Sequence, residues 1–172
     1  RGAGGTGLPP SKTMVVHSAD GTRLHTEVFG PSNGYPIVLA HGITCSLKVW
    51  YEQINDLSRD HRVIAYDHRG HGRSGVPAAS AYSLDHLAAD LDAVLAAVLR
   101  PGERAVVAGH SMGGIAISSW SDRFRHRVEQ RVDAVALINT TTGDLLDKIQ
   151  LLPVPGMFRA TRVAAARTMI RS

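Results

Sequence analysis

Short apolar runs recur along the chain at the length expected of buried β-strands. They lie at residues 13–17, 23–29, 36–40, 62–66, 104–108 and 134–138. Asp20-Gly21 separates the first two runs and supplies the turn of a β-hairpin. The later runs are almost continuously apolar, which is typical of strands buried on both faces in a parallel sheet.

Helical patterns separate the later strands. A helical stretch is predicted at 47–57, and another at 112–124 after the fifth strand. The clearest spans 83–99, where Ser83 is a plausible N-cap and apolar residues recur at helical spacing: Leu84, Leu87, Ala88, Leu91, Val94, Leu95 and Val98. Repeated strand–helix–strand units predict an α/β fold with a mostly parallel, doubly wound sheet.

Three segments of different character divide the chain. Residues 1–12 are rich in Gly and Pro and are expected to form a flexible tail. Residues 13–142 contain all six predicted strands. Residues 143–172 group apolar residues at helical spacing around Pro153 and Pro155, and they predict short helices that cover something else.

Composition excludes several classes of protein. The 172 residues suffice for one domain, and the net charge of +4 comes mostly from scattered arginines. The densest basic cluster, residues 123–127, falls at a predicted helix end, where solvated cations complement the helix dipole, so no nucleic-acid partner is expected. The single cysteine, Cys45, fits a reducing compartment. With no membrane-length apolar run and no signal-peptide pattern, a cytoplasmic location is predicted.

The stretch around Ser111 carries the clearest chemical signal. An apolar strand leads into Gly109-His110-Ser111-Met112-Gly113, and a helical pattern follows. A serine on such a strand–turn–helix corner is held in a strained conformation with its hydroxyl raised above the sheet. The glycines flank it because side chains there would collide with the neighbouring strand or helix.

Three motifs fall at the carboxyl ends of successive predicted strands, where an open α/β sheet keeps its ligand crevice. They are His41-Gly42-Ile43, the segment Asp67-His68-Arg69-Gly70-His71-Gly72-Arg73-Ser74, and Gly109-His110-Ser111-Met112-Gly113-Gly114. In these motifs and their order, residues 14–139 resemble the α/β-hydrolase superfamily, most closely its serine esterase, lipase and cofactor-free haloperoxidase-like group. The sheet is therefore expected to be of the α/β-hydrolase type, with 143–172 as the start of a helical cap. Apolar residues of 151–170 either line an acyl pocket there or belong to the core.

The resemblance implies roles for individual residues. Ser111 is the expected nucleophile, and the backbone N–H groups of Ile43 and Met112 are the expected oxyanion hole. His41 is interpreted as a structural residue that hydrogen-bonds loop backbone, because it precedes the serine in the chain. His110 is expected to point into the packing beneath the turn, and the loop of Asp67 and Arg69 is expected to hold the strand end together. No metal site and no cofactor are predicted.

The acid and the histidine of a catalytic triad are harder to find. The only histidine after Ser111 is His126, which lies at the basic end of the serine's own predicted helix. Asp144 and Asp147 follow the last predicted strand, where some members of the family carry the acid. We therefore expect a sheet truncated after about six strands. The missing C-terminal part of the protein, as a separate segment or chain, is the expected partner that supplies both groups.

The predicted function is hydrolysis of a carboxylic ester or related small acyl substrate through an acyl-enzyme on Ser111. Serine as the nucleophile argues against the epoxide hydrolase and haloalkane dehalogenase branches, which use an aspartate. Two alternatives stay open: a carbon–carbon bond hydrolase or perhydrolase of the same fold, and a non-catalytic scaffold that binds a small apolar ligand.

Overall fold

A single six-stranded sheet organises the computed structural model, which describes residues 7–141. The strands are β1 (Ser11–His17), β2 (Arg23–Phe29), β3 (Tyr35–Ala40), β4 (His61–Tyr66), β5 (Ala105–His110) and β6 (Val132–Ile138), in the spatial order β1-β2-β4-β3-β5-β6. The β1–β2 and β2–β4 pairs are antiparallel, and the β4–β3, β3–β5 and β5–β6 pairs are parallel. The predicted mostly parallel sheet is confirmed.

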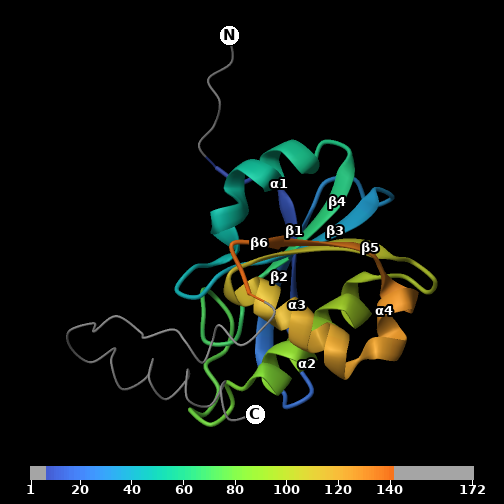
Figure 1. Cartoon of the computed structure of the whole chain (residues 1–172). Helices are drawn as coiled ribbons and strands as arrows, with labels where there is room; N and C mark the ends of the chain where they lie inside the picture. Colours follow the sequence, from blue (N-terminus) through green and yellow to red (C-terminus); the bar gives the residue numbers. More distant parts are fainter. Residues whose placement is uncertain (1–6, 142–172) are drawn as a thin grey trace.

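Helices cover both faces of the sheet (Figure 1). The short helix η1 (Leu47–Trp50) and α1 (Tyr51–Leu57) lie on one face, whereas α2 (Leu84–Val98), α3 (Met112–Arg123) and α4 (Arg125–Arg131) lie on the other. None of the helices within residues 7–141 has the length and apolarity needed to cross a membrane. The chain is thus doubly wound, as the alternating pattern predicts.

Two apolar cores lie on opposite faces of the sheet because side chains alternate along each strand. On β3, Val38 and Ala40 belong to the core under α2 and α3, and Leu39 belongs to the core under α1. On β4, Ile64 and Val63 divide in the same way. The central strands are therefore buried on both sides, which explains their continuous apolar sequence.

The predicted tail is partly strand, whereas the last described strand is an open edge, as the expected truncation after about six strands implies. β1 begins at Ser11 because its pairing with β2 extends to Ser11 opposite Phe29, so the last two residues of the predicted tail are strand. Leu8 packs against the core under α1. At the other end, Val135, Leu137 and Ile138 of β6 are 42%, 42% and 40% exposed, because β6 is the edge of the sheet in the described residues. Most of the predicted tail and the whole predicted cap, residues 1–6 and 143–172, lie outside them.

The basic cluster at 123–127 is not simply solvated. The helix expected over 112–124 ends at Arg123, and a second, unforeseen helix, α4, follows Phe124. Arg127 and Arg131 of α4 both form ion pairs with Asp92 of α2. A carboxylate from another helix, invisible in the local sequence, therefore fixes the position of α4.

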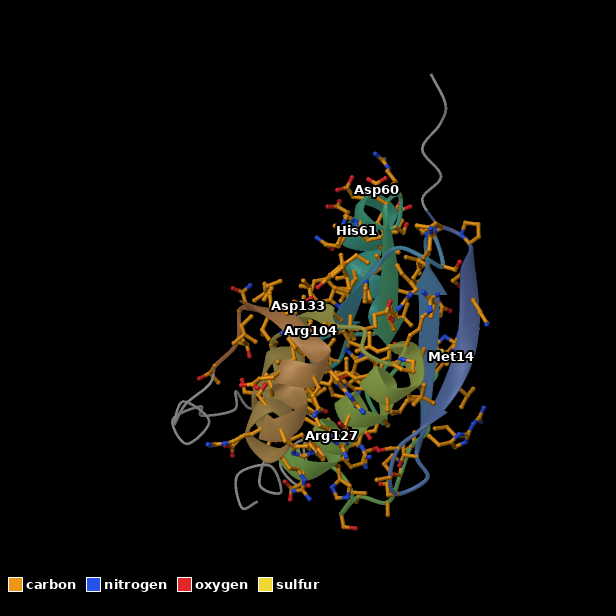
Figure 2. The ribbon with its side chains drawn as sticks, turned by 90° about the vertical axis from the view of Figure 1, so that its right-hand side faces the viewer. Met14, Asp60, His61, Arg104, Arg127 and Asp133 are labelled. Carbon is orange, nitrogen blue, oxygen red and sulfur yellow. The ribbon has the colours of Figure 1, made fainter. Side chains whose placement is uncertain are left out.

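The amino ends of the parallel strands mark the side of the sheet away from the motif loops. Figure 2 shows Asp60 and His61 where β4 begins, and Arg104 beside Asp133 where β5 and β6 begin. Arg104 Nε lies 2.8 Å from Asp133 Oδ1. The loops that carry His41, Asp67 and Ser111 leave the opposite, carboxyl ends of β3, β4 and β5, which are neighbours in the order β4-β3-β5.

Candidate active site

Ser111 stands at the corner between β5 and α3 in a backbone conformation that residues with side chains rarely adopt. Its φ is +53° and its ψ is −115°. Its N–H donates to the Ile138 carbonyl at 3.0 Å, and its own carbonyl accepts from Thr140 Oγ1 at 2.6 Å. Such strain costs on the order of 1–3 kcal/mol and persists only where the surroundings impose it. The predicted strained corner is present, and the last residue of β6 together with the chain just after it holds it in place.

The glycines around Ser111 allow three segments to approach one another closely. A Cβ added to Gly109 would lie 2.5 Å from the backbone of Gly113 and Gly114. A Cβ on Gly113 would collide with the backbone oxygen of Ala40 at the end of β3. The first turn of α3 thus packs on β5 and β3 with no room for a side chain, as the sequence motif predicts.

The loop after β3 lies against this corner. A Cβ on Gly42 would lie 3.3 Å from Ser111 Cβ and 2.8 Å from His110 Nδ1. Ile43 follows Gly42 in this loop, and Met112 is the first residue of α3. Between residues 7 and 141, the N–H groups of Ile43 and Met112 donate to no protein acceptor. The structure therefore brings the segments of all three predicted site residues together and leaves two N–H donors beside the serine segment.

Asp67 ties the loops after β3 and β4 to each other. Its Oδ1 accepts from Leu47 N–H at 2.7 Å, and its Oδ2 accepts from Arg73 N–H at 2.9 Å. Ser74 Oγ donates to the Asp67 carbonyl at 2.6 Å and accepts from His25 N–H. Both carboxylate oxygens accept from backbone donors, so this side chain holds the loops together, as expected for this motif.

Arg69, two residues further, turns away from Asp67. Its guanidinium forms a two-pronged pair with Asp90 of α2, at 2.6 Å to each oxygen, and a third contact with Asp20 at 2.9 Å. The side chains of Arg69 and Asp90 are 1% and 0% exposed. Burial raises the pKa of Asp90 even though Arg69 opposes that shift. Arg69 therefore has a structural role, as expected for this loop, but its main carboxylate partner is Asp90 of α2 and not Asp67 of the same motif.

His41 and His68 form a buried, mutually bonded pair. His41 Nδ1 donates to the Gly42 carbonyl at 2.6 Å, and its Nε2 accepts from His68 N–H at 3.0 Å. His68 Nε2 donates to the His41 carbonyl at 2.8 Å. Burial lowers the pKa of both imidazoles, that of His68 well below its usual value. The interpretation of His41 as a structural residue agrees with these bonds, because neither of its nitrogens is free to take a proton from Ser111.

The other histidines near Ser111 in sequence are equally unsuited to that role. The Nδ1 of His110 is buried beside Gly42, in the packing between the serine corner and the loop after β3. His126 is exposed on α4, beyond the far end of α3. The 12 residues of α3 rise about 18 Å along the helix axis between Ser111 and that end. The candidate acids, Asp144 and Asp147, lie outside the described residues.

The metal-binding potential of the described residues and the position of one pocket bear on the chemistry of this site. In the part of the chain that the structure describes, no group of three His, Cys, Asp or Glu side chains is arranged to hold a metal ion. A pocket of about 670 Å³ lies on the α1 side of the sheet, bordered by Leu47, Tyr51 and the His25–Glu27 pair, and Ser111 does not line it.

Two contacts at this corner have no signal in the local sequence. Thr140 holds the Ser111 carbonyl from 29 residues away, and His71 accepts a hydrogen bond from Thr44 N–H at 3.1 Å across 27 residues. Both depend on β-strand neighbours that the fold, and not the chain order, brings together.

Comparison with known proteins agrees with this geometry. A family model described as alpha/beta hydrolase fold matches residues 35–171. The chain belongs to the α/β-hydrolase fold family. Over 142 residues, the chain is 34% identical to a Mycobacterium tuberculosis protein named probable oxidoreductase EphD, and the match covers 81% of this chain and 24% of that protein. The chain is also 42% identical to 101 residues of a non-heme chloroperoxidase of Streptomyces lividans, covering 58% of this chain and 36% of that one.

Solved hydrolases of this family have the same fold. The esterase RhEst1 from Rhodococcus sp. ECU1013 superimposes with a TM-score of 0.68 at 36% identity, over 76% of this chain and 46% of that one. Epoxide hydrolase A from Mycobacterium thermoresistibile gives 0.64 at 30% identity, over 74% and 39%. The chain thus spans less than half the length of each of these four relatives, and the two solved structures are named as an esterase and an epoxide hydrolase.

Proposed function

We propose that this chain carries the nucleophile and the oxyanion hole of a serine hydrolase that acts on a carboxylic ester or related acyl substrate. The observation that supports this most is the backbone of Ser111, which is strained at φ +53° between β5 and α3 and has both its N–H and its carbonyl hydrogen-bonded to the segment of Ile138 and Thr140. A strained corner is retained where it presents a side chain for chemistry. In the proposed reaction Ser111 Oγ attacks the substrate carbonyl, the alcohol leaves, and water then releases the acid from the acyl-enzyme.

The oxyanion hole follows from the peptides beside the serine. Attack on the carbonyl places negative charge on its oxygen, and preorganised N–H donors stabilise that charge. The free N–H of Met112 opens α3, whose positive dipole end favours an anion. The Gly42 carbonyl accepts from Cys45 N–H and from His41, so the Ile43 N–H of the same peptide is turned the opposite way. Both donors are therefore held before substrate arrives.

The triad's acid and histidine come, in this proposal, from outside the 172 residues. All nine histidines of the sequence lie within the described residues. His41 and His71 each have both ring nitrogens bonded to loop backbone. The Nδ1 of His110 is buried beside Gly42, and His126 is a helix length away. The proposed partner is a further segment or chain that brings a histidine to Ser111 Oγ.

A second candidate uses the same acyl-enzyme with a different acceptor. The non-heme haloperoxidases among the relatives favour perhydrolysis, in which hydrogen peroxide in place of water attacks the acyl-enzyme and releases a peracid. The serine, the donors and the first step are unchanged. Measuring peracid and carboxylic acid released from the same ester in the presence of peroxide separates the two.

A fluorophosphonate probe tests the proposal. In the full-length protein, mass spectrometry of the digested adduct should find the phosphonyl group on the peptide containing Ser111. Ser111→Ala should abolish labelling, and Ser118→Ala, on the same helix, should leave it intact, because the Ser118 hydroxyl only bonds the Gly114 carbonyl. Wild-type protein that resists the probe, with ligand binding unchanged in Ser111→Ala, would favour the non-catalytic scaffold.

A further inference from the structure

The turn that carries Ile43 is closed in an unusual way. Cys45 N–H donates to the Gly42 carbonyl at 3.2 Å, which makes residues 42–45 a β-turn. Its third residue, Thr44, has a φ of +63°, a conformation that favours Gly or Asn in this position. A β-branched residue there is strained, so the turn needs support from outside itself.

His71 supplies that support from the loop after β4. Its Nε2 lies 3.1 Å from Thr44 N, and its Nδ1 lies 2.9 Å from the Arg69 carbonyl oxygen. A backbone N–H can only donate and a carbonyl can only accept, so His71 is neutral, with its proton on Nδ1 and a lone pair on Nε2. Both ends of the ring are therefore committed to backbone, one in each loop.

We infer that His71 is a positioning residue of the oxyanion hole. Thr44 N–H belongs to the peptide that follows Ile43, and the Gly42 carbonyl belongs to the peptide that precedes it. His71 orients the peptide between Ile43 and Thr44. His41 and Cys45 orient the peptide between Gly42 and Ile43. Ile43 is held between two fixed planes, and the direction of its N–H is set before an oxyanion forms. This role rests on the proposed function.

The other side chains at this loop do different work. Asp67 bonds the backbone of Leu47 and Arg73, outside the turn. His41 is fully buried, so its loss would disturb the core as well as the loop. His71 is half-buried, and its ring lies 5.4 Å from that of His41, centroid to centroid. Within the described residues it is the one side chain that contacts the Thr44 N–H.

Three variants of the full-length protein test this role. His71→Leu removes the acceptor, His71→Gln offers a side-chain carbonyl oxygen at a similar reach, and Val76→Ala, at a site 80% exposed in the same loop region, is the matched control. Hydrogen exchange of the Thr44 amide reports whether its hydrogen bond to His71 is intact. The kcat and KM for p-nitrophenyl acetate, and the rate of fluorophosphonate labelling, report its consequence at Ser111.

The expected results distinguish the positioning role of His71 from the proposed reaction of Ser111. His71→Leu should speed exchange at Thr44 and lower kcat and the labelling rate about tenfold, less than the roughly hundredfold or greater loss from deleting a donor, with KM nearly unchanged. His71→Gln should recover most of both, and Val76→Ala should match wild type. Fast exchange with an unchanged labelling rate would overturn the positioning role alone. Wild-type protein in which Ser111 does not react would overturn the proposed function, and the role with it.

Discussion

Gly113, in the first turn of α3, packs directly on the carbonyl oxygen of Ala40 at the end of β3. A Cβ at position 113 would collide with that oxygen, and no flexible side chain lies between to give way. The contact joins the serine corner to the strand that precedes the Gly42 loop. Two loops distant in sequence thereby share one rigid support.

Gly113→Ala should therefore lower the free energy of unfolding by about 2–3 kcal/mol, since backbone must move to admit the methyl group. Urea denaturation measures the loss. Gly7→Ala is the control, because a Cβ there meets nothing within 4 Å, and it should leave the midpoint unchanged. An unchanged midpoint for Gly113→Ala would show that α3 is not seated on β3 as described.

Replacing Ser111 tests the strain at the corner. Glycine tolerates a φ of +53° at little cost, so Ser111→Gly should be more stable than Ser111→Ala by about 1 kcal/mol. Ser118, inside α3, should show the opposite order, with Gly about 1 kcal/mol less stable than Ala. Equal stabilities for the two variants at position 111 would mean that the residue is not strained. Urea denaturation of the four variants gives both differences.

The Arg69–Asp90 pair should be among the most sensitive polar contacts in the molecule. Arg69→Met leaves the Asp90 carboxylate buried without its partner, and the free energy of unfolding should fall by about 3–5 kcal/mol. Arg125→Ala, which removes a largely exposed pair with Asp122, should have no measurable effect. A loss in Arg69→Met no greater than in Arg125→Ala would contradict the buried pairing. Thermal and urea unfolding of both variants provide the comparison.

The buried histidines predict that the fold weakens in mild acid. Burial lowers the pKa of His41 and His68 below the value of about 6.5 expected in the unfolded chain. Below about pH 6.5 the unfolded chain binds protons that the folded chain does not. The stabilisation from these neutral histidines is therefore fully present above about pH 6.5, and the free energy of unfolding falls as the pH drops toward the pKa values of the folded chain. Each histidine contributes up to about 1.4 kcal/mol per pH unit.

Urea midpoints at pH 7.5, 6.5 and 5.5 measure this dependence. His68→Asn should flatten the decline, whereas replacing the exposed His126 by Gln should leave it as in wild type. A wild-type midpoint that does not fall between pH 7.5 and 5.5 would contradict the burial of neutral imidazoles.

The sequence predicts the elements of this fold well because each signal is local. The helix over 84–98 follows from its apolar spacing and the Ser83 cap, and the structure adds only that His86 completes a reciprocal cap with Ser83. The strained corner follows from Gly109-His110-Ser111-Met112-Gly113, since only glycine fits two positions before and two positions after the serine. Periodicity, caps and glycines act over a few residues, so they can be read along the chain.

Contacts between distant segments could not be predicted in this way. The pairing of Arg69 with Asp90, of Arg127 with Asp92, and of Thr44 with His71 joins residues 21 to 35 positions apart. Each depends on which loops and helices the sheet order places side by side. For the same reason, the sequence shows that His41 precedes the serine but not that both its nitrogens are bonded to loop backbone.

The central claim is that Ser111 becomes acylated during turnover. Rapid quenching of the full-length protein during hydrolysis of p-nitrophenyl acetate, followed by peptide mass spectrometry, measures this directly. We expect one acetyl group per molecule at early times, on the peptide containing Ser111, and none in Ser111→Ala. Hydrolysis that proceeds at the wild-type rate in Ser111→Ala, or an acetyl group found only on another residue, would contradict the claim.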